Sequence, residues 1–171
     1  MKKIKYLSII GLLLVAFISN AQKPRYIKTD TYEGVAFSKY WATYPKEEKY
    51  EFIPSNKEIA AMEAKIPKMI GDMVLAFEKQ EASTNGGVVP HCKIAENLKD
   101  YKRQYCGFWK KGKNGEKVEK VIVAYFFITV TPDWEKRMII TGGGPPCDQF
   151  KIYYSVTYDK LFGFSTDYSP I

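Results

Sequence analysis

The chain has 171 residues, of which 46% are hydrophobic and 26% charged, a composition that excludes disordered and fibrous proteins. This length fits one domain with a single core, which argues against a two-domain enzyme with a large cleft. The formal net charge is +7. Part of this charge lies in the first segment of the chain rather than in the folded domain.

Residues 1–21 have the pattern of a secretory signal peptide. A basic start, Met1–Lys5, precedes an apolar run over 6–18, and Ser19-Asn20-Ala21 supplies small residues at a cleavage site. The run is shorter than the roughly 20 residues of a membrane span, so we expect cleavage after Ala21 and no span afterwards; the alternative is an uncleaved anchor. Cleavage removes three lysines and lowers the charge to +4, so nucleic acid is not an expected partner. The expected location is periplasmic or extracellular.

The mature chain, 22–171, is predicted to form one domain that begins with an aromatic-rich arm over 22–54. This arm shows no sustained hydrophobic period, so we expect an extended segment with a few short turns. Its rings either wrap and bury against the domain or face a ligand.

A helical region follows the arm. Ser55 with Glu58 three residues later predicts a capping box at the helix start. Apolar residues then recur at steps of three and four from Ile59 to Phe77, which predicts an amphipathic helix or helix pair whose apolar stripe faces the core. Pro67 predicts a kink or break in that stripe. A loop through 83–92 and a short helical turn at 94–98 come next.

The remainder of the chain predicts five strands. The first is 101–110, and Asn114-Gly115 indicates a hairpin that joins it to 118–130, whose centre is apolar on both faces, as in the middle of a covered sheet. The other three strands are expected at 136–141, 150–157 and 161–168. The predicted fold class is therefore α+β, with an N-terminal helical region packed on one face of an antiparallel meander of about five strands.

Three cysteines remain in the mature chain, and an odd count leaves one unpaired. Cys106 falls within a predicted strand, where it can pack as a small apolar side chain. Cys92 and Cys147 fall in loops, so a Cys92–Cys147 disulfide is the preferred pairing in an exported protein. The alternative is a reactive thiol at Cys92 beside His91, although neighbours in an extended segment point apart.

A resemblance covers about residues 54–168. It rests on Tyr101-Lys102-Arg103-Gln104-Tyr105 with Gly107, on Asn114-Gly115, on Trp134 and the glycines 142–144, and on Phe150 with Tyr158-Asp159. With these features the chain resembles a set of small exported proteins of Bacteroidota of unknown function. The resemblance implies an exported α+β domain and transfers no catalytic residue.

Common catalytic and metal-binding patterns are absent from the sequence. The glycines 142–144 lead to two prolines rather than to a phosphate-binding helix, one histidine without a C-x-x-C pair does not suit zinc, and no G-x-S-x-G occurs. We therefore predict no catalytic residue, no metal ligand and no cofactor.

Two groups of residues are candidates for a binding surface. Aromatic residues anchor protein interfaces and stack on sugar rings. Lysines crowd the predicted hairpin, where they either keep its tip soluble or contact an acidic polymer or protein face. The candidates are Tyr40, Trp41, Trp109, Lys110, Lys111, Lys113 and Trp134.

These observations favour an exported, non-enzymatic binding or interaction module whose partner is a protein or glycan of the envelope. The alternative is a small secreted hydrolase or an enzyme that uses a thiol, with Cys92 and His91 as its candidates. A structural piece of a larger envelope assembly is a third option.

Overall fold

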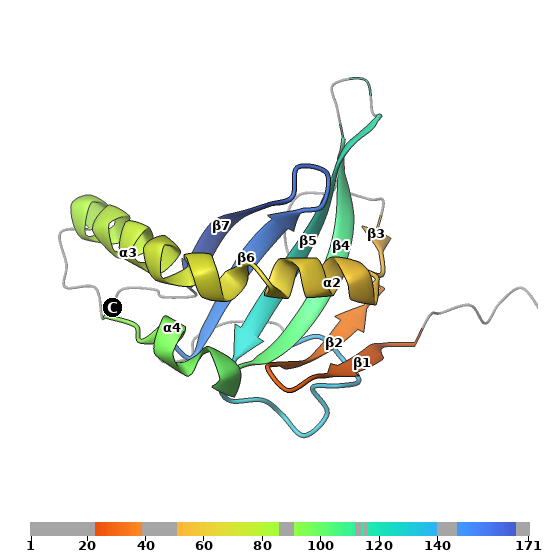
Figure 1. The fold of residues 1–171 in the computed structure, drawn as a ribbon, viewed down its shortest axis with the longest axis horizontal. Helices are drawn as coiled ribbons and strands as arrows, with labels where there is room; N and C mark the ends of the chain where they lie inside the picture. The colour runs from red at the N-terminus through yellow and green to blue at the C-terminus, as the bar shows by residue number, and fades with distance from the viewer. Residues whose placement is uncertain are drawn as a thin grey trace, which may run out of the picture.

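The computed structural model describes residues 23–38, 51–85, 91–111, 114, 116–139 and 147–166. The predicted signal peptide over 1–21 and the glycines 142–144 lie outside these residues. The elements are β1 (Arg25–Lys28), β2 (Glu33–Phe37), β3 (Glu51–Phe52), α2 (Asn56–Glu63), α3 (Ile66–Asn85), α4 (Ile94–Asn97), the 3-10 turn η1 (Leu98–Asp100), β4 (Lys102–Lys111), β5 (Lys117–Phe127), β6 (Gln149–Ser155) and β7 (Lys160–Thr166). The described residues form one sheet, and the helices precede its central strands, β4 and β5, in the sequence (Figure 1).

The strand order is β1-β2-β4-β5-β6-β7, and β3 pairs with β4 beside β2. All pairs are antiparallel except β2 with β4, which run parallel. The α+β class, the antiparallel hairpin β4–β5 and the two strands that follow it are as the sequence predicts. The sheet is larger than the predicted five strands because three strands precede the helices.

Within the predicted arm over 22–54, the structure has three strands of the sheet, β1, β2 and β3, which the sequence did not predict. Strand β2 has only five residues, and its register against β4 runs from Glu33 opposite Lys102 to Phe37 opposite Cys106. A strand this short has no measurable period, and its partner lies far along the chain. Burial of Val35, Ala36 and Phe37 follows from that distant pairing.

The helix start is confirmed in detail. The Ser55 hydroxyl accepts a hydrogen bond from the Glu58 amide, and the Glu58 carboxylate accepts one from the Ser55 amide. The break between α2 and α3 falls at residues 64 and 65, just before the predicted position. Pro67 lies in the first turn of α3, where its missing amide hydrogen costs no helical bond.

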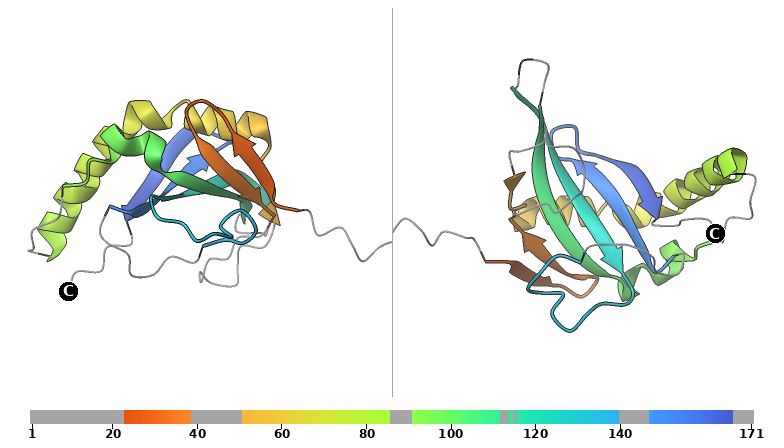
Figure 2. Two further views of the ribbon diagram at one scale, coloured as in Figure 1. Left: turned by 90° about the horizontal axis from the view of Figure 1, so that it is seen from below. Right: turned by 180° about the vertical axis from the view of Figure 1, so that it is seen from behind.

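Two buried clusters make up the core. The first contains Ile59, Met62, Ile66 and Ile70 from the helices together with alternate residues of the strands, among them Ile122 and Phe126. The second contains the other alternate residues, including Cys106, Val123 and Phe127, together with Trp134 from the segment 128–139. Figure 2 shows α2 and this segment on opposite sides of the sheet. Residues 121–127 are all buried, as predicted for a central strand covered on both sides.

The predicted strand at 136–141 is wrong for its described residues, 136–139, which form a turn and an irregular segment. The buried side chain of Gln104 on β4 explains this difference. Its amide nitrogen donates to the carbonyls of Trp134 (2.7 Å) and Arg137 (3.0 Å), and its amide oxygen accepts from the Ile139 amide (2.8 Å). A side chain therefore satisfies backbone groups that a neighbouring strand would otherwise pair.

Among the described residues, no helix combines the length and apolar character needed to cross a membrane.

Candidate functional site

The most distinct surface feature is the end of the β4–β5 hairpin, which extends past the other strands (Figure 1). Pairing of β3 with β4 ends at Phe108, and strand pairing of β6 with β5 ends at Val121. The next residue, Lys120, bonds through its backbone to Val156 and Thr157 just after β6. Beyond that point the two strands are paired with each other as far as Lys111 opposite Lys117. We call residues 109–111 and 117–120 the hairpin ribbon.

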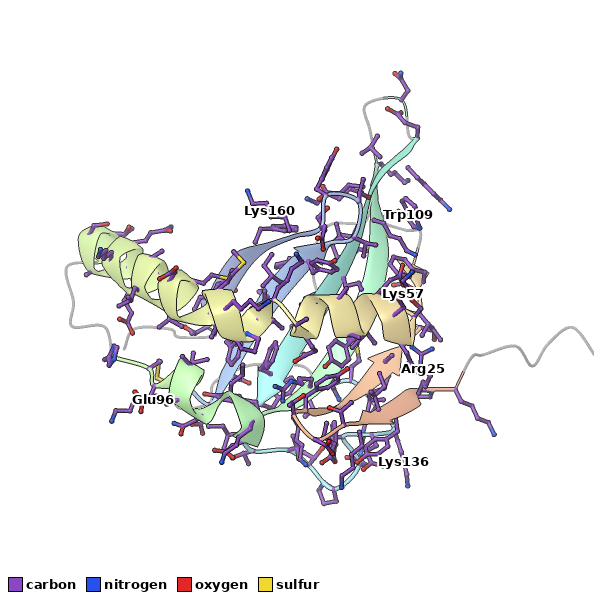
Figure 3. The ribbon with its side chains drawn as sticks, in the orientation of Figure 1. Arg25, Lys57, Glu96, Trp109, Lys136 and Lys160 are labelled. Carbon is purple, nitrogen blue, oxygen red and sulfur yellow. A yellow bond between two sulfur atoms is a disulfide. The ribbon has the colours of Figure 1, made fainter. Side chains whose placement is uncertain are left out.

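Trp109 lies at the base of the hairpin ribbon, at the end of the molecule from which the hairpin projects (Figure 3). Its indole is half-buried, and the Phe52 ring on β3 lies 6.3 Å away between centroids. The ammonium groups of Lys117 and Lys120 lie 5.6 and 5.9 Å from the indole centroid. At such distances the ring quadrupole attracts a cation. The site therefore holds an aromatic surface between positive charges.

Lys110 and Lys120 of the ribbon have acidic partners. Lys120 is paired with Glu58 at the start of α2, and Lys110 is paired with Glu119 at 2.9 Å. Burial opposes ionisation of Glu119, but hydrogen bonds from Ser155 and Lys110 outweigh it and keep its pKa below the usual value. Lys111 and Lys117 are the exposed lysines of the ribbon.

The structure therefore brings some of the predicted surface residues together and places another in the core. Trp109, Lys110 and Lys111 come together on the hairpin ribbon, whereas Tyr40, Trp41 and Lys113 lie outside the described residues. Trp134 is only 6% exposed and belongs to the second core cluster, and its ring makes an edge-to-face contact with Tyr26. Its large apolar ring fills the core instead of facing a ligand.

The Cys92–Cys147 disulfide is confirmed, with 5.4 Å between the two Cα atoms. The alternative of a reactive Cys92 thiol fails in this structure because that sulfur is already bonded to Cys147. His91 faces Glu78 instead, with its Nδ1 3.2 Å from the carboxylate. Cys106 keeps its thiol and is buried beside Met138, and burial raises its pKa.

A buried polar network that the sequence did not predict lies between α2, η1 and β4. Glu63 and Arg103 are 7% and 1% exposed. The Glu63 carboxylate accepts hydrogen bonds from Tyr105 (2.8 Å) and from the Arg103 Nε (3.3 Å), while the Arg103 guanidinium also donates to the carbonyls of Leu98 and Tyr101. Burial raises the pKa of Glu63, and its two partners offset this only in part. The sequence signal for the burial of Glu63 was its position directly after Met62, a residue of the predicted apolar stripe.

Two further groups with lowered pKa values, Asp159 and Glu33, also join elements. Asp159 links the β6–β7 turn to the helices, since it accepts from Tyr154 and pairs with Lys65 at 2.9 Å. These two partners hold its pKa below the usual value. Glu33 likewise accepts from Tyr26 and Lys102. Over the described parts of the chain, no three His, Cys, Asp or Glu side chains gather in a way that could hold a metal ion.

Comparisons of this chain with protein-family models, with curated proteins and with solved structures found no match.

Proposed function

We propose that the protein is an exported, non-enzymatic binding module of the bacterial envelope or exterior, with a glycan or a protein as its partner. In this proposal the domain belongs with the small exported Bacteroidota proteins that it resembles, and its helical region covers one face of the sheet. The hairpin ribbon is the surface that meets the partner.

The projection of the hairpin ribbon is the observation that carries this proposal. The core ends near Phe108 and Val121, which are the last residues of β4 and β5 that belong to a buried cluster in this direction. The strands continue past these residues and carry Lys111 and Lys117 outward. A two-stranded ribbon is only marginally stable by itself, so its extra length contributes little to the fold and is available for contact with a partner.

Two further features support the proposal. Ionisable groups such as Glu63 and Asp159 connect elements through hydrogen bonds and ion pairs. In this proposal their role is structural rather than catalytic. The Cys92–Cys147 disulfide suits an oxidising compartment such as the bacterial periplasm or the cell exterior.

A capture experiment tests the proposal. The tagged protein and the double variant Lys111→Gln/Lys117→Gln would be recovered from cross-linked cell envelopes, and bound protein and glycan would be identified. The control is Lys99→Gln/Lys136→Gln, which removes the same charge from exposed lysines far from the ribbon; Figure 3 places Lys136 at the opposite end of the molecule from Trp109.

We expect one partner to be enriched with the wild type and the control variant and lost with the ribbon variant. Equal recovery with all three proteins, or no enriched partner, would contradict the proposal. Surface lysines rarely affect stability by more than about 0.5 kcal/mol, so the variants should remain folded.

A further inference from the structure

The second half of α3 extends past the edge of the sheet. Figure 1 and Figure 2 show this end of the helix beyond β7, the last strand. Val74 is the last buried apolar residue of α3, and most side chains of residues 75–84, which we call the outer half of α3, are exposed. The Phe77 ring meets the Phe164 ring of β7, with 5.4 Å between the centroids. Most helical stability in proteins comes from packing, so contacts of this kind decide whether the outer half stays in place.

Glu78 ties the outer half of α3 to the segment that carries the disulfide. Its side chain is 17% exposed, and its carboxylate accepts a hydrogen bond from the backbone amide of Cys92 at 3.1 Å. The ring of His91 lies 3.2 Å from the same carboxylate. A hydrogen bond to a charged acceptor is stronger than one between neutral groups. The anchoring of the outer half through Glu78 therefore depends on where the Cys92 backbone is held.

The disulfide joins Cys92 to a fixed point of the sheet. The carbonyl of Cys147 accepts a hydrogen bond from the Tyr101 hydroxyl at 2.6 Å, and Tyr101 is 2% exposed within the first core cluster. Cys147 has a φ of 80°, a conformation that residues with a Cβ rarely adopt and that persists where the surroundings hold it. A continuous set of contacts thus runs from buried Tyr101 through Cys147, the disulfide and Cys92 to Glu78 on α3.

We propose that the Cys92–Cys147 disulfide is a redox-sensitive switch for the outer half of α3. When the bond forms, it fixes Cys92, and Glu78 holds the outer half against the domain. Without the bond, Glu78 is no longer tied to the sheet through Cys147, and the outer half is released. This inference goes beyond the proposed function, and it depends neither on the hairpin ribbon nor on the partner of the ribbon.

The switching step is a thiol–disulfide exchange with an oxidant that carries a disulfide. A thiolate of one cysteine attacks the S–S bond of the oxidant and forms a mixed disulfide, and the second cysteine then displaces the oxidant. The S–S bond of the oxidant breaks and the Cys92–Cys147 bond forms. The two electrons and the two protons of the cysteines end on the two thiols of the oxidant. In an exported chain both thiols persist until an oxidising compartment is reached, so the outer half of α3 would be fixed after export.

Hydrogen exchange followed by mass spectrometry tests this inference on the purified protein. One sample is oxidised with oxidised glutathione and the other is reduced with dithiothreitol. Labelling times are kept too short for the amides of β5 to exchange, so that only local opening is measured. We expect the amides of residues 79–84 to exchange at least about tenfold faster after reduction, the factor for loss of one hydrogen bond to a charged group.

Variants of Glu78 separate the proposed link from a general loss of stability. Glu78→Ala should speed exchange at residues 79–84 in the oxidised protein, whereas Glu78→Gln keeps an oxygen acceptor and should retain much of the protection. Asp72→Ala is the matched control, because it removes an exposed carboxylate from the first half of the same helix. In the variant Cys92→Ser/Cys147→Ser, the further change Glu78→Ala should add little, because both changes break the same link.

Three results would overturn the inference. Equal exchange at residues 79–84 in the oxidised and reduced protein would show that the packing of α4 keeps Cys92 in place without the bond. Unchanged exchange in oxidised Glu78→Ala would show that Glu78 does not hold the outer half, and this measurement does not require the reduced chain to fold. An equal effect of Glu78→Ala with and without the two cysteines would show that the carboxylate and the disulfide act independently.

Discussion

At the scale of single residues, the buried pair of Glu63 and Arg103 shows that a charge can tie a helix to a sheet without forming a reactive site. The carboxylate has two protein partners, Arg103 and Tyr105, and the guanidinium also donates to two backbone carbonyls, that of Leu98 at the start of η1 and that of Tyr101 just after it. Such a pair is weak evidence for net stability, because both charges lose their hydration. Removing one member is nevertheless costly, since it leaves the other charge buried.

We predict that Arg103→Met lowers the free energy of unfolding by about 3–5 kcal/mol near neutral pH. Without the guanidinium, burial raises the pKa of Glu63 further above its usual value of 4.5. A carboxyl whose pKa is raised by folding binds protons more tightly in the folded chain, so its destabilising effect is absent below pH 4.5 and grows as the pH rises through the folded-state pKa. Urea unfolding of variant and wild type between pH 4 and pH 8 would measure the difference.

The double variant Glu63→Gln/Arg103→Met is the control for this prediction. It lacks the buried carboxylate, so near neutral pH its stability deficit should be smaller than that of Arg103→Met, and the deficit should not grow as the pH rises. A deficit equal in both variants would mean that the unpaired charge is not the cause.

At the scale of elements, the segment 128–139 shows why a sequence pattern can predict a strand that does not form. The residues near 136–139 have ordinary strand composition, yet Gln104 on β4 bonds the backbone at residues 134, 137 and 139. The buried side chain fixes an irregular conformation because it pairs both donors and acceptors of that backbone. Nothing in local periodicity identifies such a contact across about 30 residues.

We predict that Gln104→Leu loosens this segment. The variant leaves two carbonyls and the Ile139 amide without their partner, at a cost of about 1–3 kcal/mol for each group that water cannot reach. Amide hydrogen exchange at Ile139 should become faster, and the fluorescence of Trp134 should shift as its ring gains contact with water.

Thr131→Val is the matched change within the same segment. It removes only the exposed hydrogen bond from the Thr131 hydroxyl to Asp133 and should leave exchange at Ile139 as it is in the wild type. Unchanged exchange in Gln104→Leu would show that core packing of Trp134, rather than Gln104, holds the segment in place.

At the scale of the whole molecule, sequence patterns predicted the features that depend on neighbouring residues and missed those that depend on distant ones. The capping box at Ser55, the hairpin at Asn114 and the doubly buried strand β5 each follow from a few neighbouring residues, and all three could be predicted. The parallel pairing of β2 with β4 joins residues 69 positions apart, as in the Lys102–Glu33 contact, and five-residue strands give no periodic signal of their own. The lysines of the hairpin were visible in the sequence, but the register shift of the β4–β5 pair between Lys110 and Lys111 was not.

The disulfide acts at the same scale, because it closes a loop of 55 residues that contains both central strands. Cross-linking restricts the unfolded chain, so we predict that Cys92→Ala/Cys147→Ala lowers the free energy of unfolding by about 2–4 kcal/mol. A reductant should bring the wild type to the melting temperature of this variant and should leave the variant itself unchanged, because the variant keeps only Cys106 and has no internal disulfide to reduce. Equal melting temperatures for oxidised and reduced wild type would show that tertiary packing alone holds residues 92 and 147 together. In that case the bond would contribute nothing to the free energy of unfolding.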